Sequence, residues 1–435
     1  MNLANKHVII LGAGRSGRAA AALALREGAD VSVHDSADTI SGFEASVKLV
    51  SNASEHSGAE SSSDLLVISP GIDGESDFAR AYAKNSSEMI GEVEFAARFY
   101  QGRIVAITGT NGKTTTTELV QQILSFSGTS CLACGNYGVP FSEVVILEEP
   151  PESVALEVSS FQLETISGFH PEVVIWLNFA ADHMDRYSSI DDYKNAKLRI
   201  FENLTADDVV VVRAGEDIGE QKGEVITFST EGEADYQLEG GTITMRGDQV
   251  IDLSKTRLRG LHNAENAMAA IAASVPFGVS SMSVSEALNG FAPPFHRCEL
   301  VRTLDGVEYI NDSKATNLHS LDSALRSQGR PIVLIAGGKQ KGLDYSELLP
   351  RLEQTTKTAI VFGEIGAQLL ETFEPLSGKM NTQIVTTLEE AVVAASESAE
   401  QGDTVLFSPG TSSVDMFTSY EERGDCFRRI VKNMK

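Results

Sequence analysis

The sequence predicts an α/β protein of three domains, each built around a mostly parallel sheet. Short apolar runs alternate with segments of helical spacing through most of the 435 residues, which is the pattern of doubly wound sheets. Two glycine-containing loops, at 12–17 and 109–112, each join such a run to a helix. A chain of this length also has room for two or three domains with separate cores.

The first domain is expected over 1–91 as a Rossmann-like unit. A strand at 7–11 leads into the turn Gly12-Ala-Gly-Arg-Ser-Gly17, an alanine-rich helix follows, and Asp35 stands at the end of the next strand. Taken alone, this dinucleotide fingerprint predicts an NAD-dependent dehydrogenase. Tight glycines before a helix N-terminus bind any diphosphate, however, and a UDP-sugar carries one. A further strand at 65–71 ends at the edge where such a ligand would lie.

The second domain, expected over 92–293, is a central P-loop ATPase-type unit. After the apolar run 104–107 the chain reads Gly109-Thr-Asn-Gly-Lys-Thr114 and continues with helical spacing. Backbone N–H groups of such a loop bind phosphate, Lys113 can reach the outer phosphates, and the Thr114 hydroxyl can ligand Mg²⁺. The spacing is tighter than in the general P-loop and is typical of one superfamily of ATP-dependent ligases. We therefore expect ATP binding.

The rest of the second domain and the third domain continue the alternation. The stretch 209–258 combines β-like alternation with many Gly, Glu and Asp residues, which predicts a small antiparallel excursion beside the parallel sheet. The third domain, expected over 294–435, reads as a second Rossmann-like unit with little ambiguity. Strands are expected at 154–158 and 173–178 in the second domain, and at 307–310, 331–336, 358–362 and 404–407 in the third.

Composition excludes several classes of function. The formal net charge of -26 argues against binding to nucleic acid or to an anionic membrane. No apolar run approaches the length of a membrane span and no signal-peptide pattern is present, so a cytoplasmic protein is expected. Cys131 and Cys134 form a lone C-x-x-C with no second pair to complete a zinc site, and reduced thiols are expected there.

Acidic residues and one histidine follow the strands of the second domain. Glu157 lies within an apolar strand, where a carboxylate needs a partner, and Mg²⁺ is a natural one. His183, flanked by Asp182 and Asp185, comes directly after another strand and could ligand a metal or orient a phosphate. A structural role for the histidine is the alternative.

Lys197 has an unusual position in a segment of helical period. Ile190, Tyr193 and Ile200 belong to one apolar stripe with Phe201 and Leu204, and Lys197 falls in its middle. Desolvation lowers the pKa of a buried lysine, and the neutral amine could react with CO₂ to give an anionic carbamate. The chemistry alone favours the other reading, in which the lysine snorkels to the surface or binds a phosphate.

Polar groups of the third domain could bind a nucleotide. Asp312 and Lys314 follow the strand at 307–310, where they could bind ribose hydroxyls and phosphate. Arg297, in Pro-Phe-His-Arg-Cys, stands near the expected domain boundary and could reach ATP.

Together these motifs resemble the Mur ligase family, the ATP-dependent amino-acid ligases of peptidoglycan precursor synthesis. The resemblance runs in family order across nearly the whole chain. It rests on the loop at 109–114, on Leu156-Glu-Val-Ser-Ser-Phe-Gln-Leu-Glu164, Asp182-His-Met-Asp-Arg-Tyr187, Ala196-Lys-Leu-Arg-Ile200, Asn311-Asp-Ser-Lys-Ala-Thr-Asn317, Ser408-Pro-Gly-Thr-Ser-Ser-Val-Asp415 and Glu421-Glu-Arg-Gly-Asp425. The Asp-Asn-Pro-Arg motif of the diaminopimelate- or lysine-adding members is missing, as is the N-terminal signature of the alanine-adding member. The resemblance is strongest to the D-glutamate-adding member.

The resemblance implies a role for each candidate residue. Lys113, His183 and carbamylated Lys197 would be catalytic, and two Mg²⁺ ions would be held by Thr114, Glu157, His183 and Lys197. ATP would be bound by Gly109, Thr110, Asn111, Gly112, Lys113, Thr114, Thr115, Asn263, Asn266, Arg297, Asp312 and Lys314. The UDP end of the substrate would contact Arg15, Ser16, Asp35, Ser36, Ser69, Pro70 and Gly71, its muramoyl end Asn136, and D-glutamate Thr316, Lys341 and Ser413. Tyr420 stands where related enzymes have phenylalanine.

The reaction implied is the ATP-dependent addition of D-glutamate to UDP-N-acetylmuramoyl-L-alanine through an acyl phosphate, by a monomer that binds neither nucleic acid nor membrane. A sister ligase would keep the loop, Glu157 and Lys197 but differ around Thr316, Lys341 and Ser413. A dehydrogenase would rest on the first glycine loop and Asp35 alone, and would leave the second loop unexplained. A nonenzymatic ATP-binding regulator would leave the metal-competent groups without a purpose.

Overall fold

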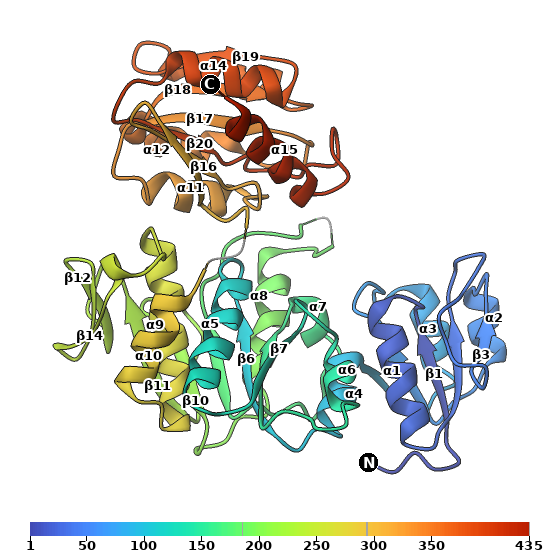
Figure 1. Ribbon diagram of the computed structural model, residues 1–435. Helices are drawn as coiled ribbons and strands as arrows, with labels where there is room; N and C mark the ends of the chain where they lie inside the picture. Colours follow the sequence, from blue (N-terminus) through green and yellow to red (C-terminus); the bar gives the residue numbers. More distant parts are fainter. Residues whose placement is uncertain (185, 293–294, 435) are drawn as a thin grey trace. The chain divides into compact units, whose positions relative to one another are not determined.

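The computed structural model describes residues 1–184, 186–292 and 295–434. The chain forms two compact units, Met1–Asp252 with Glu265–Gly290, and Leu253–Ala264 with Phe291–Lys435. Three sheets run through these units, mostly parallel and joined by helices (Figure 1), so the expected α/β class is confirmed. The division into three domains stays a prediction, and of its two boundaries the one expected between residues 293 and 294 falls outside the described residues.

The first sheet is wholly parallel, in the order β3-β2-β1-β4-β5. Its central strand β1 alternates between two cores, because Val8 and Ile10 pack on one face and Ile9 and Leu11 on the other. Apolar runs buried on both faces are typical of parallel sheets. The elements are β1 (His7–Leu11), α1 (Arg15–Arg26), β2 (Asp30–His34), β3 (Lys48–Val50), α2 (Glu55–Glu60), β4 (Leu65–Ile68), α3 (Asp77–Ala83) and β5 (Met89–Gly91).

The second sheet has nine strands in the order β14-β13-β12-β11-β10-β9-β6-β8-β7. The elements up to the seventh helix are α4 (Glu92–Ala97), β6 (Arg103–Thr108), α5 (Lys113–Phe126), β7 (Cys131–Gly135), α6 (Phe141–Val145), β8 (Ser153–Glu157) and α7 (Ser160–Leu163). They are followed by β9 (Val173–Trp176), α8 (Ile190–Leu198), η1 (Arg199–Phe201), β10 (Val209–Arg213), β11 (Glu224–Ser229), β12 (Tyr236–Glu239), β13 (Thr242–Met245), β14 (Asp248–Asp252), η2 (Leu253–Lys255), α9 (Leu261–Ser274), η3 (Val275–Phe277) and α10 (Ser281–Gly290).

The antiparallel excursion expected at 209–258 is smaller than the sequence suggested. Strand β10 pairs in parallel with β9, and β11 pairs in parallel with β10, so both strands extend the parallel sheet. Only β12, β13 and β14 pair antiparallel, and the turn Gly240–Gly241 joins the first two. Both glycines have positive φ, 56° and 87°, as a two-residue hairpin turn that follows the strand twist requires.

The third sheet has the order β15-β16-β20-β17-β18-β19, antiparallel only between its first two strands. Alternate residues of β17 face two cores: Leu334 packs with the helices that follow β16 to β18, and Ile335 packs with the last two helices. The elements are β15 (Glu299–Leu304), β16 (Val307–Asn311), α11 (Leu318–Arg326), β17 (Ile332–Gly337), η4 (Tyr345–Leu348), α12 (Leu349–Thr355), β18 (Thr356–Phe362), α13 (Gly366–Phe373), η5 (Glu374–Leu376), β19 (Asn381–Ile384), α14 (Leu388–Ser398), β20 (Thr404–Phe407) and α15 (Tyr420–Asn433).

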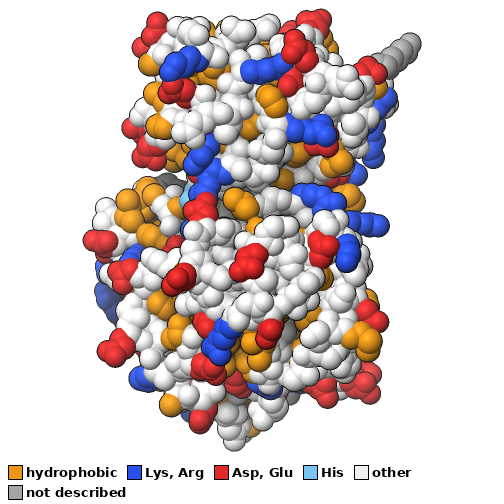
Figure 2. Space-filling view, turned by 90° about the vertical axis from the view of Figure 1, so that its left-hand side faces the viewer, with side chains coloured by type: hydrophobic (Ala, Val, Ile, Leu, Met, Phe, Trp, Pro, Cys, Tyr) orange, Lys and Arg blue, Asp and Glu red, His pale blue; other side chains and the backbone are white. Residues whose placement is uncertain are grey.

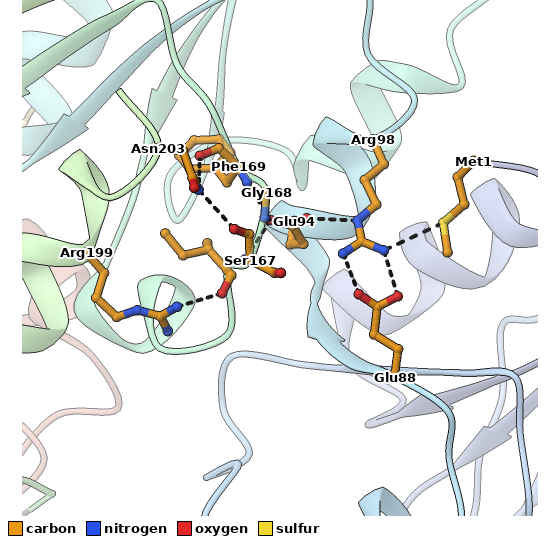
Figure 3. A network of polar contacts seen from close by, with 10 residues as sticks. Met1, Glu88, Glu94, Arg98, Ser167, Gly168, Phe169, Arg199 and Asn203 are labelled. Atoms are coloured by element: carbon orange, nitrogen blue, oxygen red, sulfur yellow. Dashed lines mark hydrogen bonds and ion pairs between the residues drawn. The ribbon is translucent and has the colours of Figure 1, made fainter. Parts of the chain in front are cut away.

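A buried carboxylate fixes helix α4 to the loop before β9. Glu94 is 1% exposed and accepts backbone N–H bonds from Ser167, Gly168 and Phe169 at 2.9, 3.0 and 2.7 Å. Arg98 lies between the carboxylates of Glu94 and Glu88 (Figure 3). Hydrogen bonds from N–H groups to a carboxylate are strong because one partner is charged, so this loop is firmly placed.

The many acidic residues that give the chain its net charge of -26 are visible on its surface. Acidic side chains are scattered over the face shown in Figure 2 instead of gathering in one patch. Among the described residues, every helix is too short or too polar to span a bilayer. The four cysteines are free thiols, three of them buried, and burial raises the pKa of Cys131 to about 11.

Candidate active site

The loop between β6 and α5 depends on two glycines. Gly109 has a φ of 151°, and Gly112 has a φ of 85° and immediately precedes helix α5. A Cβ on Gly109 would lie 2.9 Å from Cβ of Leu177, and one on Gly112 would lie 2.3 Å from Oδ1 of Asn266. Both positions therefore exclude any side chain, and the backbone turns tightly into the helix N-terminus, as in a phosphate-binding loop.

Asn178, at the end of the β9 run, holds this loop in place. Its side chain accepts a hydrogen bond from Asn111 N at 2.9 Å and donates one to Asn111 O at 3.1 Å. Its backbone oxygen accepts from Thr110 N at 3.0 Å. The sequence analysis gave Asn178 no role; its position at the carboxyl end of a strand beside the loop was the available signal.

Two lysines converge on one carbonyl of the loop. The ammonium of Lys113 donates to the oxygens of Gly109 and Thr110, both at 2.9 Å. Lys197 also donates to Gly109 O at 2.9 Å, and only 2% of this residue is exposed. Burial, reinforced by the charge of Lys113, holds the pKa of Lys197 well below its ordinary value, and the carboxylates of Asp182 and Glu157 oppose this shift. The inward position predicted for Lys197 is confirmed.

The apolar stripe around Lys197 is confirmed except at its first position. Tyr193 and Ile200 are each 1% exposed, and Phe201 and Leu204 are also buried, whereas Ile190 is 48% exposed. Ile190 is the first residue of helix α8, where the side chain extends past the packed turn toward solvent. The helix brings Lys197 under the loop because Tyr193, one turn earlier, anchors the same face.

Glu157 has one satisfied and one unsatisfied carboxylate oxygen. The residue is 3% exposed, and Oε1 accepts a hydrogen bond from Nδ2 of Asn136 at 2.8 Å. Oε2 is buried without a hydrogen-bond partner among the described residues. A buried carboxylate oxygen without a donor is costly and fits a cation. Asn136, expected at the muramoyl end of the substrate, is here a neighbour of the predicted metal ligand.

His183 lies half exposed beside an aromatic cluster. Its ring centroid is 5.0 Å from that of Phe161 and 5.9 Å from that of Tyr193. Its backbone N–H donates to Asp182 Oδ1 at 2.9 Å, while the predicted neighbour Asp185 falls outside the described residues. No group of three His, Cys, Asp or Glu side chains in the described part of the chain is arranged to hold a metal, so the predicted Mg²⁺ sites would need Thr114 and Lys197 as well.

Asn266 joins helix α9 to the start of α5. Its Oδ1 accepts a hydrogen bond from the Thr116 hydroxyl at 3.3 Å and lies against Gly112. Asn263, one turn earlier, donates to Arg259 O at 2.8 Å and belongs to the other compact unit. Within the first unit, the structure thus brings the loop, Glu157, Lys197 and Asn266 together.

The first glycine loop has the expected shape, and the carboxylate of Asp35 hydrogen-bonds to backbone N–H groups beside it. A Cβ on Gly17 would lie 1.9 Å from Gly12 O, so the helix approaches the turn closely. The Asp35 carboxylate accepts N–H bonds from Ala13 at 2.6 Å and Ala37 at 2.8 Å. Oδ2 thus braces the glycine loop and Oδ1 braces the chain just after β2, and the contacts predicted for Asp35 with a ribose or with the UDP end of the substrate stay predictions.

The residues predicted for the UDP end share one edge of the first sheet. They follow β1, β2 and β4, which are adjacent strands, and they are Arg15, Ser16, Asp35, Ser36, Ser69, Pro70 and Gly71. Ser69 Oγ is buried and has no hydrogen-bond partner among the described residues. Arg15 donates to Gly138 O at 2.6 Å.

In the second unit, Asp312 is buried at the end of β16. It accepts hydrogen bonds from Cys298 N at 3.1 Å and from the Ser408 hydroxyl at 2.8 Å. Burial raises the pKa of Asp312 to about 7, against the hydrogen bonds and the nearby charge of Arg297, which lower it. The Lys314 ammonium lies 3.7 Å from the ring centroid of Tyr420, which gives the tyrosine a cation–π contact.

The residues predicted to bind D-glutamate are Thr316, Lys341 and Ser413. They follow three neighbouring strands, β16, β17 and β20. Lys341 Nζ donates to Thr316 O at 3.3 Å, and Ser413 is 3% exposed. A surface depression of about 810 Å³ lies beside them, at the ends of β17, β18 and β19. Its lining includes Lys339, Val414 and Asp415, but not the three predicted residues.

Arg423 was also given no role by the sequence analysis. It is 1% exposed and donates to Ser313 Oγ and Ser313 O, at 3.0 and 2.8 Å, and to Thr411 O at 3.1 Å. Burial lowers its pKa to about 10. The motif Glu421–Asp425 contained it, but an arginine in a charged helix gives no sign that it is buried.

The fold and the second loop define an α/β protein with a tight glycine loop that leads into a helix N-terminus at the carboxyl edge of a mostly parallel sheet. The Mur ligase middle domain matches residues 107–274, and the Mur ligase glutamate ligase domain matches residues 296–410. The chain belongs to the Mur ligase family.

Relatives match over their full length. The UDP-N-acetylmuramoylalanine–D-glutamate ligase of Geobacter metallireducens is 39% identical over 99% of this chain and 98% of its own. The enzyme of the same name from Salinibacter ruber is 37% identical over 98% and 97%.

Solved structures share the fold. The MurF ligase from Thermotoga maritima in complex with ADP has a TM-score of 0.62 at 16% identity, covering 99% of this chain and 96% of that one. The UDP-N-acetylmuramate-alanine ligase MurC from the same organism has a TM-score of 0.61 at 19% identity, covering 99% and 100%.

Proposed function

We propose that this protein is an ATP-dependent ligase that adds D-glutamate to UDP-N-acetylmuramoyl-L-alanine, in peptidoglycan precursor synthesis. The observation that carries the proposal is the convergence of Lys113 and buried Lys197 on Gly109 O, because Lys113 can neutralise the outer phosphates of a nucleotide and Lys197 can be converted into a metal-binding carbamate. Full-length relatives named for this reaction give the choice of substrates.

ATP would bind at the loop 109–115, with its phosphates at the N-terminus of α5. Thr114, Glu157, His183 and Lys197 would hold Mg²⁺, and the unsatisfied Oε2 of Glu157 fits this use. The bound ions would supply neutralisation of charge on the transferred phosphoryl group. Asn263, Asn266, Arg297, Asp312 and Lys314 would bind the remainder of the nucleotide.

Lys197 would act as a carbamate. Because burial lowers the pKa of Lys197, its neutral form is more favoured than that of an exposed lysine, and the nitrogen of the neutral amine can form a bond to the carbon of CO₂ and lose one proton to solvent. The product is an anion, which would relieve the repulsion from Lys113 and add a carboxylate beside Glu157.

The reaction would then proceed in two steps. A carboxylate oxygen of the L-alanyl group attacks the γ-phosphorus, and the bond to the ADP oxygen breaks. The amine nitrogen of D-glutamate attacks the resulting acyl phosphate, phosphate leaves, and the amine loses a proton. Lys113 would stabilise the charge that develops on the phosphoryl oxygens, and His183 would help to position the amine.

The two ends of the substrates would be recognised by the other loops. Thr316, Lys341 and Ser413 would bind D-glutamate, Asn136 the muramoyl end, and the loops after β1, β2 and β4 the UDP end. We further propose that the protein acts as a monomer in the cytoplasm and binds neither nucleic acid nor membrane.

Phosphate release would test the proposal, measured with ATP, Mg²⁺ and UDP-N-acetylmuramoyl-L-alanine across a panel of amino acids. Release that depends on D-glutamate is expected. Dependence on another amino acid would identify a sister ligase. Absence of release with every amino acid would contradict the proposal, and a titration with a nicotinamide dinucleotide would then test the dehydrogenase alternative.

A further inference from the structure

Glu164 connects the two segments that carry His183 and Lys197. It follows helix α7, and both of its carboxylate oxygens accept hydrogen bonds from the loop after β9. Oε2 accepts from Arg186 at 2.7 Å, and Oε1 accepts from the Tyr187 hydroxyl at 2.5 Å. The Arg186 and Glu164 side chains are 18% and 25% exposed, so the ion pair is largely shielded from solvent.

The partners of Glu164 hold the backbone of His183. The N–H groups of Arg186 and Tyr187 donate to His183 O at 3.0 and 3.1 Å. His183 itself has a φ of 57°, in the left-handed region that residues with a side chain rarely adopt. Such a conformation persists where the surroundings fix it, and here the two residues that fix it are both bound to one carboxylate.

The end of helix α7 also contacts the segment that carries Lys197. Arg199, two residues after Lys197, donates to the backbone oxygens of Leu163, Glu164 and Ile166, at 3.1, 2.5 and 2.7 Å. These carbonyls belong to the last residue of α7 and to the residues just after it, where carbonyl groups lack helical partners. The backbone of Glu164 therefore faces the Lys197 segment while its side chain faces the His183 loop.

Aromatic contacts add to the link with the His183 loop. The Phe161 ring stacks on Tyr187 with centroids 5.9 Å apart, and the Arg186 guanidinium lies 4.5 Å from the Phe161 centroid. Arg186 also lies 3.7 Å from Asp73, but Glu164 is its nearer carboxylate. The sheet order separates α7, after β8, from the loop after β9 by one strand, β6, so this contact bridges two strand ends across the phosphate-binding loop.

We propose that Glu164 is a positioning residue for the reaction: its carboxylate sets the conformation of His183 through Arg186 and Tyr187. The proposal rests on the function proposed above for the role of His183 in catalysis, but the structural link itself does not. Among the described residues, no hydrogen bond of Glu164 reaches the loop 109–115 or a residue predicted to bind nucleotide, so its effect would be transmitted through the loop after β9.

The test compares Glu164→Gln with Glu88→Gln. Glu88 forms the same kind of partly exposed ion pair with an arginine, Arg98, in the same unit, and this pair includes no residue of the His183 loop. The first readout is hydrogen exchange at the amides of Arg186 and Tyr187 without substrate. We expect exchange about 10-fold faster in Glu164→Gln and unchanged in Glu88→Gln.

The second readout is steady-state kinetics. In Glu164→Gln, kcat/KM for the UDP-linked substrate should fall about 10- to 100-fold, the range seen when a supporting partner of a functional ligand is removed. KM for ATP should change by less than about twofold, because the phosphate-binding loop is untouched. If Glu164→Gln does not fold, Tyr187→Phe removes the hydroxyl that donates to Glu164 Oε1 and leaves the Arg186 ion pair, so it should give a smaller change of the same kind.

Two results would overturn the proposal. Exchange at Arg186 and Tyr187 equal to that of the unaltered protein would show that Glu164 does not hold the loop. Faster exchange with kinetics equal to those of Glu88→Gln would show that the held conformation is irrelevant to the reaction. Because exchange is measured without substrate, an inactive unaltered protein would contradict the proposed function and leave the structural link to be decided by exchange.

Discussion

The ammonium group of Lys197 and the carbonyl oxygen of Gly109 are hydrogen-bonded at 2.9 Å, and the Lys113 ammonium binds the same oxygen. A carbonyl oxygen would only partly offset two positive charges, so the charged form of Lys197 is disfavoured beside Lys113, in line with its lowered pKa. The loop is thereby prepared for phosphate, or for conversion of one lysine into an anion, before any ligand binds.

Replacement of Lys197 by Met should abolish ligase activity, by at least about 1,000-fold, because the buried amine is lost. Lys194→Met is the matched control, since Lys194 lies on the same helix and pairs with Asp217 at 2.9 Å. Phosphate release measures both variants. Retained activity in Lys197→Met would remove the carbamate from the mechanism. A carbamate should also appear as a ¹³C signal in protein equilibrated with ¹³CO₂, absent from Lys197→Met.

Replacement of Glu157 by Gln should uncouple the protein from Mg²⁺. The unaltered protein should gain thermal stability with Mg²⁺ and ATP, by about 3 kcal/mol at 100-fold saturation. Glu157→Gln should lose the part of this stabilisation that depends on Mg²⁺, because the amide lacks the charge that a hard cation prefers. Melting temperatures with and without Mg²⁺ measure this, and exposed Glu149→Gln is the control. An undiminished Mg²⁺ effect in Glu157→Gln would place the metal elsewhere.

Gly112→Ala should lower the free energy of unfolding by more than the strain of a left-handed backbone at residue 112 accounts for. Gly128→Ala is the control, because Gly128 has a φ of 89° and no described atom within 4 Å of an added Cβ. Each substitution should lower the free energy of unfolding by about 1 kcal/mol, because alanine is strained in the left-handed backbone conformation. Gly112→Ala should cost about 1–3 kcal/mol more, for the clash with Asn266 Oδ1. Urea unfolding measures the difference, and equal losses would contradict the close approach.

Asp312→Asn should flatten the pH dependence of stability. Burial raises the pKa of Asp312 to about 7, whereas an unfolded aspartate has a pKa of about 3.9. Between these values the folded protein keeps a proton that the unfolded chain has lost, so the free energy of unfolding falls as pH rises. The loss is at most about 4 kcal/mol. Melting temperatures from pH 4 to 8, in both proteins, measure it; parallel curves would exclude a raised pKa.

Much of the fold could be predicted because its signals are local. The strand, glycine loop and helix around Lys113 are contiguous, and the period of helix α8 indicated that Lys197 faces inward. The direction of β10 and β11 could not be predicted, because strand direction depends on which strands pair across the chain. Exposed Ile190 illustrates the same limit at one residue, since a helical stripe does not show where the covering surface ends.

The residues of the candidate site could be predicted where they belong to one contiguous sequence motif. They were harder to predict where they act through long-range contacts. Glu157 and the loop residues come together as expected within the first unit. Asp35 matched a ribose-binding pattern, but its two oxygens are used by backbone N–H groups. Asn178, Glu164 and Arg423 act through partners 22 or more residues away, or through backbone atoms, and neither kind of contact leaves a pattern in the sequence.

The antiparallel hairpin β12–β13 offers a site at which a tag or a label can be introduced into the enzyme. Its turn, Gly240–Gly241, is exposed, and an atom added to either glycine meets no described neighbour within 4 Å. The turn also lies three strands beyond β9 in the sheet order. A short peptide epitope or a cysteine for a fluorophore can therefore be inserted there, so that the protein can be immobilised or imaged while its chemistry is followed undisturbed.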